Sequence, residues 1–567
     1  MAHHEQPIEM APHESEDVSK NLENTASYQE GVQQVEAITQ VWSKRALWIT
    51  FALLYVVSFV DSLMEATQTQ LTPYVTSTFS EHALLSTTNV ISTIVGGVAA
   101  LPVAKIINIW GRVEGFTIMI LLIVVGLITK AVCHNVETYA AAQTIFWIGH
   151  IGLGYIIDVF LADMTTLQGR MLIFGINATP SIATTFSGPA IAQDYLDGST
   201  WRWTFGTFAI VMPTFAIPVL ISFILNRQKA KRHGLMPERE SGRSSYMSVR
   251  HYVREFDVFG ILLTTAGFAL ILLPLSLASS SASKWQSGHI IVMLVIGVCC
   301  LIEFVVWERW FVPIPYLPWK YLKDRTILAS CVCFFALFTS IYCWDIYFSS
   351  YLQVVNQQSV KNAGYILNSY SLASSVFSPL VGFLIQRTGR FKWLGMAAIP
   401  FSALGTGLLV YFRHPGAGIG YLVMCQIFNG VAGAIVPLCT QMAVMVSVGH
   451  NEVAVVLALH TVFGSMGAAI GLAISGAIWT NTLPRAIHNH LPEAQKDQYM
   501  TIYSSLKTQL SYKWGSPVRE AIVAAYGDTQ RLLAVTGACF IPLMFIMIFA
   551  WKDLDVRRVV QTRGNVF

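Results

Sequence analysis

Long apolar runs separated by short polar joints make up most of this chain. Most of the runs are near or above the roughly 20 residues that an α-helix needs to cross the hydrocarbon core of a bilayer. The pattern predicts fourteen transmembrane helices, over Leu47–Thr67, Leu84–Ile107, Phe116–Val132, Tyr139–Phe160, Met171–Gln193, Trp203–Leu225, Val258–Ala278, His289–Val306, Ile327–Leu352, Ala363–Ile385, Trp393–Phe412, Ile419–Val446, Val453–Thr480 and Leu532–Trp551. We therefore predict an all-α polytopic membrane protein.

The composition excludes several other classes of protein. Hydrophobic residues make up 54% of the chain and charged residues only 12%, against about a quarter charged in soluble domains. Lys and Arg (36) nearly balance Asp and Glu (32), so no nucleic-acid partner is expected. The nine Cys residues lie in or beside apolar runs and suggest neither a disulfide framework nor a zinc site. We predict no cofactor and no protein-ligated metal.

The distribution of Lys and Arg orients the chain, because cytoplasmic loops hold the excess. With the N-terminus inside, 25 of these residues fall in the cytoplasm and six between the last two helices. The remaining five fall in short outer loops, namely Lys130, Arg202, Lys284, Lys361 and Arg413. Both termini are then cytoplasmic.

The polar stretches divide the chain into predicted units. These are a disordered cytoplasmic tail (1–45), a six-helix bundle (46–225), a basic cytoplasmic linker (226–256), two additional helices with a connector (257–325), a second six-helix bundle (326–555) and a cytoplasmic tail (556–567). The second bundle includes a long outer loop at 482–531. This loop carries Tyr499, Tyr503, Tyr512, Trp514 and Tyr526, which suit either a solvated loop or one that folds over a ligand.

A short motif occurs twice. Asn108, Gly111 and Arg112 follow the second predicted helix, and Gln386, Arg387, Gly389 and Arg390 follow the tenth. Matching positions at cytoplasmic helix ends indicate duplicated halves, as in transporters built from repeats. The offset of eight helices rather than six places helices 7 and 8 as an insertion, giving a 6+2+6 arrangement.

These motifs resemble the gating signature of the major facilitator superfamily, and Gly382 to Lys392 fits it closely. The resemblance implies two bundles that alternate access to a central site. It also assigns Asn108, Gly111 and Arg112, with Gln386, Arg387, Gly389 and Arg390, to gating. The usual Asp of the signature is replaced by Asn108 and Gln386, so amide hydrogen bonds are expected where an ion pair is usual.

Longer strings resemble the fungal siderophore-iron transporter family. They are Phe59 to Leu63, Ser187 to Ala190, Trp201 to Trp203, Trp344 to Val354 and Ala363 to Ile366. The resemblance covers roughly residues 45 to 555 and implies fourteen spans with a long last outer loop. A siderophore surrounds ferric ion with its own oxygens, so such a transporter needs no iron ligands of its own.

Acidic residues within the spans are candidates for proton coupling, because a membrane-buried charge costs about 2.5–3.5 kcal/mol on insertion scales. Asp61 and Glu65 lie four residues apart on one helix face, and Asp345 lies on the corresponding helix of the second half. The alternative is that these acids are structural, and that Glu65 is solvated near the outer end. For His150 and His460 we favour helix packing, and for Arg170 a side chain that reaches the membrane interface.

Aromatic residues on the ninth and tenth helices are candidates for substrate binding. We select Trp344, Tyr347, Tyr351 and Tyr370, since an aromatic ring with one polar group suits a large, mostly neutral ligand. Few fixed cations face outward, which favours neutral ferric hydroxamates over anionic catecholates.

Together these features predict a proton-coupled importer of ferric siderophores, a secondary transporter rather than an enzyme. Its partners would be the ferric siderophore, protons and the lipid bilayer, and it is expected to be a monomer. The plasma membrane is the favoured location, with endosomal and vacuolar membranes left open. The alternatives are a glutathione/proton exchanger, a multidrug/proton antiporter and a non-transporting nutrient sensor on the same scaffold.

Overall fold

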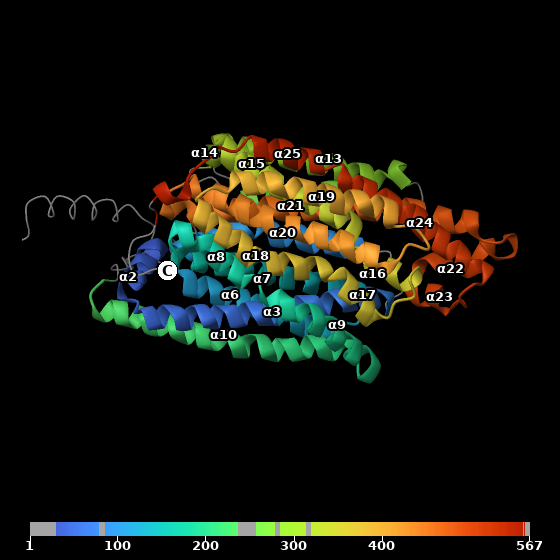
Figure 1. The fold of residues 1–567 in the computed structure, drawn as a ribbon, viewed down its shortest axis with the longest axis horizontal. Coiled ribbons are helices and arrows are strands. Elements are labelled where there is room, and N and C mark those ends of the chain that lie inside the picture. The colour runs from blue at the N-terminus through green and yellow to red at the C-terminus, as the bar shows by residue number, and fades with distance from the viewer. Residues whose placement is uncertain are drawn as a thin grey trace, which may run out of the picture.

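The computed structural model describes residues 30–78, 85–235, 257–277, 284–312, 319–559 and 561. Over these residues the secondary structure is helical, and most helices run along one long axis (Figure 1). The first half of the chain forms α2 (Glu30–Val41), α3 (Lys44–Thr78), α4 (Leu85–Val98), α5 (Ala100–Ile109), α6 (Arg112–Val132), α7 (Val136–Asp163), α8 (Leu167–Asn177), α9 (Pro180–Gly198) and α10 (Trp201–Arg232).

The second half of the chain is likewise helical. It forms α12 (Val258–Leu277), α13 (Gly288–Trp310), α14 (Trp319–Lys323), α15 (Arg325–Asp345), α16 (Phe348–Val354), α17 (Val360–Leu367), α18 (Ser369–Thr388), α19 (Lys392–Phe412), α20 (Ile419–Val446), α21 (Val453–His490), α22 (Tyr499–Ser504), α23 (Leu506–Ser511), α24 (Pro517–Ala538) and α25 (Ile541–Phe549). Short 3₁₀ turns η2 (Lys284–Gln286), η3 (His450–Glu452), η4 (Glu493–Gln498) and η5 (Val556–Arg558) join some of them.

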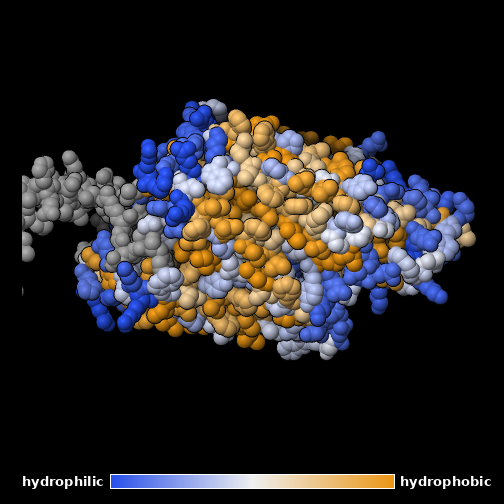
Figure 2. All heavy atoms as spheres, in the orientation of Figure 1, coloured by the Kyte–Doolittle hydropathy of each residue, from blue (hydrophilic) through white to orange (hydrophobic). Residues whose placement is uncertain are grey.

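The helices form a body with an apolar waist. Within the described residues, eleven helical segments are long and apolar enough to cross a membrane. Orange apolar side chains cover the middle of the molecule, and blue polar ones gather at both ends (Figure 2). This confirms the predicted all-α membrane fold. The three other predicted spans are broken or shorter, as α8 with α9, α17 with α18, and α12, so the count of fourteen stays a prediction.

The two ends of the long axis differ in character. We call the end that holds α2, α14 and η3 the inner end, since the charge distribution predicts that it is cytoplasmic. The opposite end, where α22 and α23 lie, is the outer end (Figure 1).

The predicted disorder of residues 1–45 is wrong for the part that the structure describes. Residues 30–41 form α2, which packs against α5 and α10. Val35, Ala37 and Ile38 are buried, and the Lys229 ammonium donates to the carbonyl of Val41 at 3.2 Å. A short apolar stripe is enough to dock this polar segment onto the bundle.

The long outer loop is a folded cap. Residues 482–490 extend α21, residues 517–531 belong to α24, and η4, α22 and α23 lie between them. Tyr503 and Tyr526 are buried while Trp514 is half exposed. The guanidinium of Arg519 donates to the carbonyls of Gln509 and Val354, the latter at 2.8 Å. The cap is therefore fixed to α16 rather than solvated along its length.

The two additional helices pack unequally on the rest. α12 contacts α13 and also reaches α4 and α21. α13 buries little of its surface inside the protein, and its exposed side chains are mostly apolar. The predicted domain boundaries remain predictions, since helix contacts alone do not divide the chain.

Candidate functional site

Two acids of α3 meet a histidine of α7 in the middle of the bundle. The Asp61 carboxylate lies 3.0 Å from Nδ1 of His150, and the Glu65 carboxylate lies 3.9 Å from Nε2 of the same ring. Asp61 and His150 are largely buried, whereas the Glu65 side chain is 51% exposed. We call Asp61, Glu65 and His150 the acid–histidine cluster.

Local structure fixes this geometry. Asp61 and Glu65 are one helical turn apart, so their side chains share a face. On α3, Tyr55 and Ser58 bond to Thr179 and Asn177 at the break between α8 and α9, at 2.8 and 3.1 Å. These bonds set the rotation of α3 and turn its acidic face toward α7.

His150 is the residue of this cluster whose role the sequence did not reveal. Its ring stacks with Phe146 at 5.7 Å and meets Trp147 edge-on at 5.2 Å, but its nitrogens face the two acids. The packing interpretation is thus wrong for His150. For His460 it is confirmed, because that ring stacks on Phe334 at 3.8 Å and bonds to Thr440 at 2.9 Å.

Asp345 lies apart from the cluster, at the last residue of α15. Tyr342, one turn earlier, is within electrostatic reach of both Glu65 and Asp345. Arg413 reaches the same helix end, donating to the carbonyl of Trp344 at 2.6 Å and to Gln530 at 2.7 Å. Arg413 follows the last residue of α19, in the connection to α20 where the sequence places it, but its side chain is buried against Phe348.

Three of the aromatic residues predicted to bind substrate are enclosed in the protein. Trp344, Tyr347 and Tyr351 have almost no exposed surface, and Tyr347 stacks on Trp479 at 3.9 Å. Their side chains are packed inside the protein in this structure, and their role in substrate binding stays a prediction. The reason for this packing is a helix break: α15 ends at Asp345 and α16 begins at Phe348, so these rings turn into the core that joins α16 to α21 and α24.

Tyr370 is the fourth aromatic candidate and is only partly buried. Its hydroxyl lies over Gly433 of α20, where a side-chain carbon would clash with it. The small residue leaves room for the ring on the inner face of α18. Tyr370 therefore stays the substrate-binding candidate with accessible surface.

The first gating motif is held by an amide and by an acid from another helix. The Arg112 guanidinium donates to the Asn108 side chain at 3.0 Å and to the Ile107 carbonyl at 2.8 Å, and pairs with Asp163 at 3.3 Å. Gly111 has φ +125°, which favours glycine. The amide bond was expected, but the carboxylate that neutralises Arg112 comes from the end of α7 and was not identified from the sequence.

The second gating motif contacts the C-terminal segment and the first half. Gly389 has φ +70°, and its carbonyl accepts from the amide of Val556 at 2.9 Å. Arg390 pairs with Asp553 at 3.2 Å. The Gln386 carbonyl accepts from Gln168 at 3.2 Å. A cavity of about 470 Å³ lies here and is lined by Gln168, Phe383, Gln386, Arg387 and Arg557.

At the inner end, four further contacts join residues far apart in the chain. Tyr155 donates to the Ala454 carbonyl at 2.8 Å, and Asp158 accepts from Gln441 at 3.1 Å. His450 lies 3.7 Å from Asp163. Arg170 donates to Gln561 at 3.0 Å.

We call the group of Asp163, Arg170, His450 and Gln561 the inner latch. Arg170 is fully buried there, so the prediction that it reaches the membrane interface is wrong. Carbonyls at the α7–α8 turn accept from its guanidinium at 3.0 and 3.3 Å, and these bonds replace the water that a buried charge loses.

Contacts also cross between the first and second halves at the outer end. The Tyr74 hydroxyl donates to Gln353 at 2.8 Å. Gly364 of α17 lies directly against Pro189 of α9. The helices that carry the acid–histidine cluster thus take part in contacts between the halves, α3 at the outer end and α7 at the inner end, which fits a central site of the alternating-access kind.

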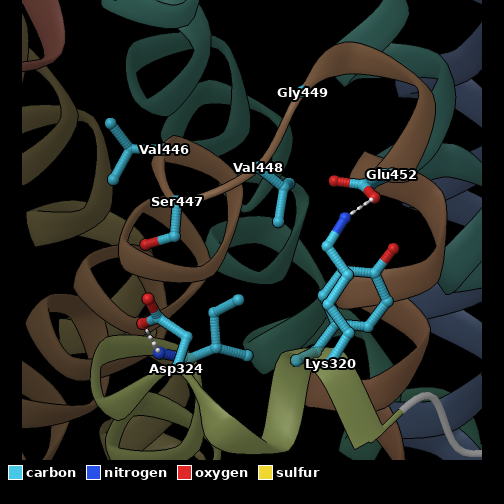
Figure 3. Close-up of a pocket in the computed structure, with 9 residues that line it drawn as sticks. Lys320, Asp324, Val446, Ser447, Val448, Gly449 and Glu452 are labelled. Carbon is cyan, nitrogen blue, oxygen red and sulfur yellow. Dashed lines mark hydrogen bonds and ion pairs between the residues drawn. The ribbon is translucent and has the colours of Figure 1, made fainter.

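A separate pocket of about 350 Å³ opens at the inner end, between α14, α20 and η3 (Figure 3). Lys320 and Glu452 form an ion pair at 2.6 Å on its wall. None of the predicted substrate residues lines it. This pocket is therefore separate from the predicted substrate residues.

Comparison with known proteins identifies the family. A model of the Major Facilitator Superfamily matches residues 54–355 and 333–487. The chain is 44% identical over 561 residues to "MFS siderochrome iron transporter 1" of Ajellomyces capsulatus, covering 98% of this chain and 97% of that protein. It is 41% identical to "MFS siderochrome iron transporter D" of Aspergillus fumigatus, covering 99% and 93%.

The fold also matches a solved transporter. The crystal structure of the peptide transporter POT in complex with sulfate superposes with a TM-score of 0.55 at 14% identity, covering 92% of this chain and 99% of that one. Among the described residues no group of three or more His, Cys, Asp or Glu could hold a metal ion. The chain belongs to the Major Facilitator Superfamily, in the transporter family of the fungal MFS siderochrome iron transporters.

Proposed function

We propose that this protein imports ferric siderophores by alternating access, with protons bound at the acid–histidine cluster as the driving ions. The substrate class is supported by near-full-length relatives named siderochrome iron transporters, at 44% and 41% identity. The coupling is supported by one observation above all, the contact of Asp61 and Glu65 with His150 inside the bundle. Inward movement of one proton contributes about 2.3 kcal/mol per 100 mV of membrane potential.

The hydroxamate preference is supported by the outer-loop cations. Lys130 and Arg413 are buried, and Arg202 donates to the Cys133 carbonyl at 2.6 Å. Few cations of the short outer loops are then left to attract an anionic ferric catecholate, while the outer cap still carries exposed ones such as Lys507 and Lys513. A neutral ferric hydroxamate needs none.

Uptake of radiolabelled ferric siderophores tests this function in a yeast strain that lacks its own siderophore transporters. We expect cells that express the chain to accumulate ferric hydroxamates by uptake across the plasma membrane, and we expect a protonophore to abolish this accumulation. Ferric catecholates serve as the matched anionic substrates and should accumulate less. Absence of uptake of every ferric siderophore, together with export of glutathione or drugs, would contradict the proposal.

A further inference from the structure

Lys130 is a buried cation close to the acid–histidine cluster. It lies in the last turn of α6 and is fully buried. Its ammonium donates to the Gln68 side chain at 2.8 Å and sits over the rings of Phe146 and Phe205, 3.7 and 5.3 Å from their centroids. Among the described residues it makes no ion pair with a carboxylate. Such a charge is costly to bury without a compensating role.

Two of these contacts lead directly to the cluster. Gln68 follows Glu65 by three residues on α3, so their side chains are neighbours on the helix surface. The Phe146 ring, over which the Lys130 ammonium lies, also stacks with the His150 ring, with 9° between the two ring planes. Lys130 is near enough to His150 to repel its protonated form. The ammonium is thus separated from Glu65 by one side chain, that of Gln68, and from His150 by one side chain, that of Phe146.

The summed charge of Asp61, Glu65 and Lys130 bears on the number of protons that the cluster takes up. With Asp61 and Glu65 ionised, the cluster without Lys130 carries two negative charges and needs two protons to become neutral. With a protonated Lys130 ammonium included, it needs one. A neutral cluster can be enclosed inside the bundle as the bundle changes state, whereas a charged one resists burial.

Resting on the proposed function, we infer that Lys130 is a positioning residue for proton coupling: when its ammonium is protonated, its charge lets the acid–histidine cluster work with a single proton. The other ionisable groups facing this region are a thiol, a phenol and one guanidinium. They are Cys133 on the turn after α6, Tyr342 on α15 and Arg202 on α10. The Arg202 guanidinium is directed to the Cys133 carbonyl.

The experiment measures uptake of a ferric hydroxamate against external pH for wild type, Lys130→Met and Lys130→Arg. Removing the cation makes proton binding more favourable, so the alkaline limb of Lys130→Met should move upward by about one pH unit. Lys130→Arg keeps the charge and should keep the wild-type midpoint. Lys361→Met, at an exposed outer position, is the matched control and should not shift.

The pH dependence of uptake distinguishes failure of the inference about Lys130 from failure of the proposed proton coupling. An unshifted midpoint in Lys130→Met, beside proton-dependent wild-type uptake, overturns the inference alone. Wild-type uptake that ignores both pH and a protonophore overturns the proposed coupling instead. If Lys130→Met does not reach the membrane, Lys130→Gln takes its place with the same expected shift.

Discussion

Asp61 differs from the other membrane acids in the kind of partner it has. Its carboxylate contacts an imidazole at 3.0 Å in a largely buried setting, and a hydrogen bond to a charged group contributes about 1.5–3 kcal/mol. Glu65 is half exposed on the same helix face, so it can exchange protons with water. The exposed acid Glu65 thus lies beside the buried contact of Asp61 with His150, an arrangement that suits proton transfer from an aqueous cavity.

Asp61→Asn should retain folding but lose coupling, because an amide takes up no proton. We expect accumulation of ferric hydroxamate to fall by about tenfold or more, in line with a lost charge-assisted bond. Exchange of bound for free siderophore, which needs no net proton movement, should remain. Transport assays in proteoliposomes with an imposed pH gradient separate the two.

The control is Glu303→Gln, which changes an exposed acid on α13 and should leave both rates unchanged. Asp345→Asn is measured beside it, since Asp345 is the acid assigned to the second half. Uphill transport by Asp61→Asn at the wild-type rate would show that the proton binds elsewhere.

At this scale the sequence was informative about acids and uninformative about bases. Asp61, Glu65 and Asp345 stand out because an acid in an apolar run is costly. Lys130 and Arg413 did not stand out, because a basic residue at the end of an apolar run is assigned to a loop, and Arg170 was expected to reach the membrane interface. Their side chains turn inward to carbonyls and amides, and hydropathy does not record that direction.

Among the elements, α9 shows how a small residue determines packing. Gly188 lies so close to α3 that an added side-chain carbon would sit 2.6 Å from the side chain of Ala66. Close approach of this kind is typical of small residues between membrane helices. Since α3 carries Asp61 and Glu65, the contact at Gly188 helps to hold the cluster in position.

Gly188→Val should push α9 away from α3. Overpacking of this kind costs about 1–3 kcal/mol, so we expect a lower melting temperature in detergent and weaker siderophore uptake. Gly198→Val is the matched substitution at the end of the same helix, where nothing lies within 4 Å of the added carbon. Equal losses of stability in the two variants would contradict the packing argument.

Helix existence was predictable from the apolar runs, but the breaks were predictable only in part. Pro180 opens α9, and proline favours the first turn of a helix, so this break had a signal. The break between α15 and α16 has no proline or glycine between Asp345 and Phe348. It turns Tyr347 and Tyr351 into the protein interior, a direction that the sequence did not predict.

In the molecule as a whole, the inner latch joins segments that are distant in the chain. Burial, with the charges of Arg170 and Arg112, holds the pKa of His450 below its ordinary value, against the attraction of Asp163. When the inner end opens and His450 is hydrated, its pKa returns toward about 6.5. The closed state therefore binds the proton less well than the open one.

The sign follows directly: closure is stabilised at neutral pH and weakened as the pH falls through the ordinary range of histidine. After correction for the intrinsic pH dependence of amide exchange, residues 447–452 should be less protected from hydrogen–deuterium exchange near about pH 5.5 than at about pH 7.5. His450→Gln should remove most of this difference, whereas His414→Gln, near the outer end, should not. A wild-type response retained in His450→Gln would assign the pH effect to another group.

The latch also shows where a single sequence stops being informative. Asp158 and Gln441 are 283 residues apart, and His450 meets Asp163 from a turn that carries no motif. The repeated gating motif revealed two related halves, but nothing in the pattern says which side chains close the space between them.

The place of Gln561 has a practical consequence. Its side chain donates to the carbonyls of Met445 and Val448 at 2.6 and 2.5 Å and accepts from Arg170, only six residues before the end of the chain. A fluorophore fused after Phe567 would therefore be attached six residues after a member of the inner latch. The fluorescence of such a fusion would report opening and closing of the inner latch during transport. A bulky purification tag at the same place would hinder closure of the latch.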